Sequence, residues 1–164
     1  MDVNVLRFES TSALKKVQLD PDGELALIVP PPEMTEEELR KRIDQMEWTG
    51  IGKQALDLFH KAQEINPAER RLWSKLGLTL YDGEYYLEAL EAFDRAAELT
   101  ESNAWLIVWQ GHILDLLGRR EEAVQCYRDA LKIGKGLNSQ HDQYGMQINR
   151  KWVEERLKSS FRRK

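Results

Sequence analysis

The stretch RRLWSKLGLTLYDG (residues 70–83), followed by EYYLEALEAFDRAAEL (residues 84–99), decides the fold. Its apolar residues recur every three or four positions, as Leu76 and Leu80 do, on both sides of a central Asp-Gly pair. This spacing places apolar side chains on one face of an α-helix, and Asp-Gly is typical of a turn. The two stretches therefore predict a hairpin of two amphipathic helices.

The same pattern recurs along the chain with a period of 34 residues. Four groups of residues keep this period: Gly77, Gly111 and Gly145; Ala55, Ala89 and Ala123; Phe59, Phe93 and Tyr127; Ala62, Ala96 and Ala130. Chance rarely places four groups in one register, so the chain contains a repeated pair of helices.

The small residues of each unit suggest how its two helices pack. A glycine inside a helix costs about 0.5–1 kcal/mol relative to alanine, so close packing must offset that cost. We expect Gly77 to meet Ala89, and Gly111 to meet Ala123, where the two helices of a hairpin cross. The aromatic residues, such as Phe93, are expected to fill the gap between neighbouring hairpins.

This pattern resembles the tetratricopeptide repeat, W-x2-L-G-x2-Y followed by A-x3-F-x2-A and a proline. The resemblance covers residues 36–69, 70–103 and 104–137, about three-fifths of the chain. It is weakest at the start of residues 36–69, where Arg42 and Ile43 replace the Leu-Gly pair. It implies an all-α fold, in which residues 35–137 form a right-handed α-solenoid of three helical hairpins.

The segments outside the repeats differ from them in pattern. Residues 1–34 predict an extended or β-hairpin arm, because apolar runs flank an Asp-Pro-Asp-Gly turn at residues 20–23. A proline run then precedes Thr35-x-x-Glu38, a capping box that opens the first helix. Residues 138–164 predict a capping helix from about Asp142 to Lys158 and a basic tail, since solenoids need a polar-faced terminal helix.

Composition and motifs exclude several classes of function. The net charge of −4 argues against a general nucleic-acid binder, and no apolar run approaches the roughly 18 residues that span a bilayer. A single cysteine, Cys126, and an N-terminus without a signal-peptide pattern favour the cytoplasm. Residues 49–54 (TGIGKQ) lack the full phosphate-binding loop, and Gly50 and Gly52 are interpreted as turn residues.

Catalysis is not expected in these residues. The three histidines, His60, His112 and His141, have no metal-ligand spacing, and Cys126 is interpreted as a small packing residue. We therefore predict no enzyme activity, no metal site and no cofactor.

The resemblance also implies where a partner binds, because in this family the first helices of successive repeats line a concave groove. Aromatic and apolar residues on these helices predict a protein partner with an apolar or aromatic segment, bound extended or helical. Basic residues near them would steer acidic flanks of that segment. The candidate partner-binding residues are Trp105, Trp109, His112, Tyr81, Leu78, Lys75, Arg40 and Lys41.

Several alternatives stay open from the sequence. The carboxylate clamp for chaperone C-terminal tails is rejected, because Asp44, Trp105 and Trp109 stand where that clamp needs an amide and two cations. The two indoles could instead belong to the core, against the terminal helix. The module could also be a self-association or regulatory domain whose groove holds its own N-terminal arm, a homodimer, or an accessory domain of a longer chain.

Overall fold

The computed structural model describes residues 7–10, 13–19, 25–28, 33–46, 52–134, 137 and 149–160. The chain divides into two compact units, Met1–Met34 and Thr35–Lys164. The first unit contains strands, and the second contains helices in all of its described regular structure.

The first unit holds an antiparallel sheet in the order β1-β2-β3. Its strands are β1 (Arg7–Ser10), β2 (Ala13–Leu19) and β3 (Leu25–Ile28). In the register, Val17 of β2 pairs with Leu27 of β3, so the two apolar runs of the arm lie in neighbouring strands. The predicted turn at residues 20–23 lies outside the described residues.

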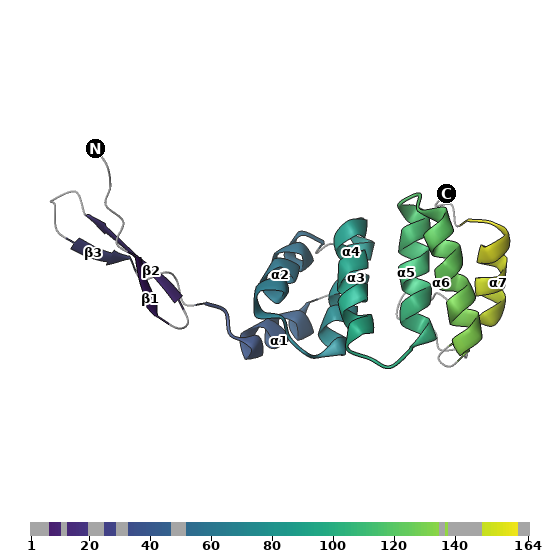
Figure 1. The fold of residues 1–164 in the computed structure, drawn as a ribbon, viewed down its shortest axis with the longest axis horizontal. Helices are drawn as coiled ribbons and strands as arrows, with labels where there is room; N and C mark the ends of the chain where they lie inside the picture. The colour runs from purple at the N-terminus through teal and green to yellow at the C-terminus, as the bar shows by residue number, and fades with distance from the viewer. Residues whose placement is uncertain are drawn as a thin grey trace. The chain divides into compact units, whose positions relative to one another are not determined.

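The second unit contains seven described helices (Figure 1). They are α1 (Glu36–Gln45), α2 (Gly52–Ile65), α3 (Arg70–Asp82), α4 (Tyr86–Glu98), α5 (Ala104–Leu116), α6 (Arg120–Ile133) and α7 (Arg150–Lys158). The densest packing joins α3 to α4 and α5 to α6, and α6 in turn contacts α7. The all-α prediction for the repeats is confirmed for the described residues.

The start of α1 shows the predicted capping box. The Thr35 hydroxyl accepts a hydrogen bond from the Glu38 backbone N–H at 3.2 Å, and the Glu38 carboxylate accepts one from the Thr35 N–H at 3.1 Å. Two of the helix's unpaired backbone donors are thereby satisfied, and three glutamates in the first turn complement its dipole.

The helix glycines meet aromatic rings, which corrects the prediction that they meet alanines. A Cβ added at Gly77 would lie 2.9 Å from Cε2 of Phe93, and one at Gly111 would lie 2.9 Å from Cε1 of Tyr127. At these distances a Cβ would clash with the ring of the same hairpin, so only glycine leaves the rings room. Spacing alone places these residues on one face, but it does not say which side chain is nearest.

The same rings also reach the following helix, as predicted. Phe59 lies 6.3 Å from Trp73, and Phe93 stacks on Trp109 at 5.5 Å with nearly parallel planes. Phe93 thus contacts both Gly77 of its own hairpin and the tryptophan of the next one.

Two boundaries differ from the predictions. Gly52 is the first residue of α2 and not a turn residue, and a Cβ there would lie 3.0 Å from Cα of Gly83. The last helix begins at Arg150, since Asn149 is extended and its side chain accepts a hydrogen bond from the Trp152 N–H at 2.9 Å. The remainder of the predicted helix, residues 142–148, lies outside the described residues.

Candidate functional site

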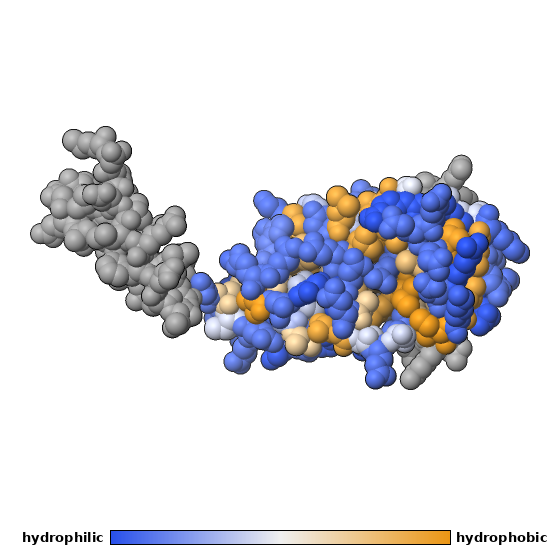
Figure 2. Space-filling model, in the orientation of Figure 1, coloured by the Kyte–Doolittle hydropathy of each residue, from blue (hydrophilic) through white to orange (hydrophobic). Residues whose placement is uncertain are grey.

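The face predicted to bind a partner becomes less exposed from α1 to α5. On α1, Glu37 and Asp44 are exposed. On α3, Leu78 is 4% exposed, and on α5, Val108 and His112 are both 0% exposed. Figure 2 shows hydrophilic residues over much of the visible face of the helical unit, with hydrophobic patches toward the α5–α7 end. Most of the accessible part of the candidate site therefore lies on α1 and the start of α3, and on α5 the partly exposed Trp105 adds to it.

The predicted aromatic anchors come together in one buried cluster. Trp109 has no exposed surface and packs against Phe93, and its ring lies edge-on to Tyr81 at 5.0 Å. The Tyr81 hydroxyl and Nε2 of His112 form a hydrogen bond at 2.9 Å. Burial of a tryptophan and a histidine among aromatic rings is typical of a core.

Trp105 is placed differently from Trp109. It is partly exposed, and its ring meets Phe93 edge-on at 6.1 Å and Trp109 at 6.0 Å. It lies over the buried cluster with one part open to solvent. Among the predicted aromatic and apolar anchors, Trp105 keeps the surface that a ligand could contact, whereas Trp109, His112, Tyr81 and Leu78 are buried.

A charged network joins α1 to α3 on the accessible side. Nε of Arg40 donates to the Glu69 carboxylate at 2.8 Å, and Arg71 pairs with both Glu69 and Asp44. Nζ of Lys75 donates to the backbone carbonyl of Asp44 at 3.1 Å, near the end of α1. The network therefore holds the two helices together, while its side chains remain largely in solvent.

The network shifts the ionisation of its own members. The hydrogen bond from Arg71 lowers the pKa of Asp44, and the one from Arg40 lowers the pKa of Glu69. Partial burial lowers the pKa of Lys75, an effect that the Asp44 charge opposes. Beside the network is an open hollow on α1 lined by Glu37, Arg40, Lys41, Asp44 and Gln45.

A second charged group, at the opposite end, is buried. The Asp115 side chain has no exposed surface, and its carboxylate accepts hydrogen bonds from Nη1 of Arg120 at 2.9 Å and from the Tyr127 hydroxyl at 2.8 Å. Burial, and then the hydrogen bond to Asp115, raise the pKa of Tyr127 above its ordinary value. The phenol therefore stays protonated and serves as a donor.

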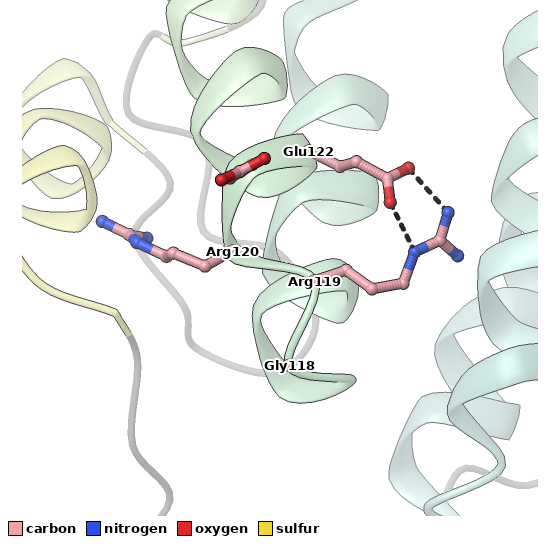
Figure 3. A pocket seen from close by; sticks show the side chains of 5 residues that line it. Gly118, Arg119, Arg120 and Glu122 are labelled. Atoms are coloured by element: carbon pink, nitrogen blue, oxygen red, sulfur yellow. Dashed lines mark hydrogen bonds and ion pairs between the residues drawn. The ribbon is translucent and has the colours of Figure 1, made fainter.

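Arg120 also reaches the last helix. Its Nη2 donates to the carbonyls of Arg156 and Leu157, at 2.6 and 3.1 Å. In Figure 3 the Arg120 side chain points toward α7, whereas Arg119 points the other way and pairs with Glu122. This contact was not predicted from the sequence. A carboxylate inside the apolar run ILDLL was the available signal, since a buried charge needs a partner.

The described residues contain no group of three His, Cys, Asp or Glu side chains that could hold a metal ion. Burial raises the pKa of Cys126 to about 11, so its thiol is protonated at neutral pH and is a poor nucleophile. None of the helices in the described residues is long and apolar enough to cross a bilayer.

The predicted partner-binding residues thus form two groups. Arg40, Lys41 and Lys75 lie at the charged α1–α3 side, and Trp105 lies over the aromatic cluster that contains Trp109, His112 and Tyr81, while Leu78 is buried on α3. No curated protein and no solved structure matches the chain. Residues 106–133, which span most of α5 and all of α6, match the family model of the tetratricopeptide repeat, and this match confirms the resemblance predicted from the sequence.

Proposed function

We propose that this chain is a protein–protein interaction module that binds a polypeptide segment on the exposed faces of α1 and α3. The observation that carries the proposal is the hollow on α1, whose lining combines Arg40 and Lys41 with the carboxylates of Glu37 and Asp44. Side chains that present both charges on a repeat scaffold suit a segment with charged flanks.

The proposal includes the wider organisation predicted from the sequence. Residues 36–69, 70–103 and 104–137 would stack as a right-handed solenoid, with an arm before them and a cap after them. We also propose a cytoplasmic location and no catalytic role. Trp105 is the residue proposed to supply an aromatic contact, because Trp109 is buried.

A peptide-selection experiment tests this site. A phage-displayed library of random peptides is selected on the full chain, and the selected peptides are then measured against Arg40→Glu/Lys41→Glu. The control is Lys53→Glu/Lys61→Glu on α2, which changes the net charge equally at exposed positions. We expect the α1 variant to lose at least about tenfold in affinity, as the loss of two interface charges can produce, and the α2 variant to bind as the parent does.

Equal binding by the two variants would remove the α1 face as the site. Deletion of residues 1–32 addresses the alternative in which the N-terminal arm fills the groove. If the arm competes for the site, the deleted chain binds the selected peptides more tightly, and if it does not, the affinity is unchanged. Loss of a dimer in the deleted chain, seen by its mass in solution, would instead favour self-association.

A further inference from the structure

Helix α7 packs against α6 at the end of the stack. Tyr127 of α6 lies edge-on to Trp152 of α7, with ring centroids 6.1 Å apart. This contact continues the series in which Phe59 meets Trp73 and Phe93 meets Trp109 across successive hairpins. His112 of α5 also contacts the Trp152 ring, at 5.7 Å. α7 therefore covers the end of the stack (Figure 1).

By itself α7 has little to keep it folded. It has nine residues, and of these only Val153 is buried. Isolated helices shorter than about 12 residues are marginal in water, so the order of α7 depends on its contacts with α5 and α6. The hairpins, by contrast, bury several residues from every helix of α3–α6.

Two arginines join α7 to α6. Nη2 of Arg150 donates to the carbonyl of Leu131 at 3.2 Å on an exposed side, and Arg120 makes the contact that reaches the buried part of the molecule. One nitrogen of its guanidinium binds the Asp115 carboxylate, and another binds two carbonyls in the last turn of α7. Those carbonyls lie where a helix lacks internal donors, at the negative end of its dipole. A planar guanidinium can contact a carboxylate and the helix end together, and a lysine ammonium cannot do so in the same geometry.

We propose that α7 is a detachable cap latched by Arg120, which opens while the three hairpins remain folded. Opening would expose the rings of His112 and Tyr127 that Trp152 now contacts. The proposal does not depend on the peptide site on α1, which lies at the other end of the helical unit. Local opening of this kind is expected where few apolar contacts hold an element.

Hydrogen exchange under native conditions tests the proposal on the full chain. In the parent protein, amides of α7 should exchange at least about tenfold faster than those of α3–α6. Arg120→Lys keeps a positive charge near Asp115 but loses the double contact, so α7 should exchange about tenfold faster again while α3–α6 are unchanged. Arg119→Lys is the control, because Arg119 pairs with the exposed Glu122 and not with α7.

A second variant keeps the test independent of the buried ion pair. Trp152→Ala removes the α7 side of the ring contacts and leaves Asp115 and Arg120 in place. This variant too should raise the rate of amide hydrogen exchange in α7 and leave the rate in α3–α6 unchanged. The proposal is overturned if α7 exchanges together with α3–α6 in the parent, if both variants raise exchange in all helices equally, or if Arg120→Lys behaves like Arg119→Lys.

Discussion

The two ends of the helical unit use the same contact in different surroundings. At the α1 end, Lys75 donates to the carbonyl of Asp44, and at the α7 end, Arg120 donates to the carbonyls of Arg156 and Leu157. The carboxylate beside Lys75 is 43% exposed, whereas that of Asp115 is fully buried. Each end therefore pairs a helix terminus with a cation, but the neighbouring carboxylate is open to water only at the first.

This difference decides how much each contact contributes. Exposed ion pairs typically contribute up to about 1 kcal/mol, because water and salt screen them. Removing one partner of a buried pair costs about 3–5 kcal/mol, because the other charge is left without compensation. The α1 end is thus a polar surface that tolerates substitution, whereas the network around Asp115, between α5 and α6, behaves as core.

The largest effect is expected from Trp109→Ala. This change removes a fully buried ring that packs on Phe93 and Tyr81, so the free energy of unfolding should fall by about 3–5 kcal/mol. The matched change Trp105→Ala should cost about half as much, because the Trp105 ring is partly in solvent. Urea unfolding followed by far-UV circular dichroism measures both, and equal losses would contradict the placement of the two indoles.

The pairing of helices was predictable because periodicity determines it. The 34-residue spacing of glycine, alanine and aromatic residues predicted the helix pairs, and the match to residues 106–133 supports that interpretation. The capping box at Thr35 was equally visible, since it is a local signal within four residues. Local and periodic features of this kind need no knowledge of distant contacts.

What the sequence did not reveal depends on contacts between distant segments. The resemblance to the repeat family assigned Trp109 and His112 to the groove face. It does not show whether other segments of the same chain cover that face. The pairing of Asp115 with Arg120 was not predicted for the same reason, because Arg120 in turn binds α7. The predicted start of the last helix was wrong, although Asn149, a preferred N-cap residue, marks the observed start.

An intermediate effect is expected from Tyr127→Phe. The ring remains over Gly111, but Asp115 loses the hydroxyl that donates to it at 2.8 Å. A hydrogen bond to a charged group is worth about 1.5–3 kcal/mol, and Arg120 still compensates the carboxylate, so the lower part of this range is expected. Tyr85→Phe, which removes a hydroxyl just before α4, is the control for thermal and urea unfolding. A loss no larger than that of the control would show that the buried network is not needed.

The smallest effect is expected at the α1 end, and it should depend on pH. Asp44 and Glu69 have folded-state pKa values below those of the unfolded chain, because Arg71 and Arg40 donate hydrogen bonds to them. Such groups stabilise the fold at neutral pH, and their contribution is lost as the pH falls from about 4 through the lower folded values. Both side chains are well solvated, so each contributes less than about 1 kcal/mol.

The difference in unfolding free energy between the parent and Asp44→Asn/Glu69→Gln should therefore be small at pH 7, shrink below pH 4, and also shrink in high salt. If this difference in free energy grew in acid, the direction of the pKa shifts given for the two carboxylates would be wrong. A difference of several kcal/mol at pH 7 would mean that the α1 end contributes as much to stability as the buried end.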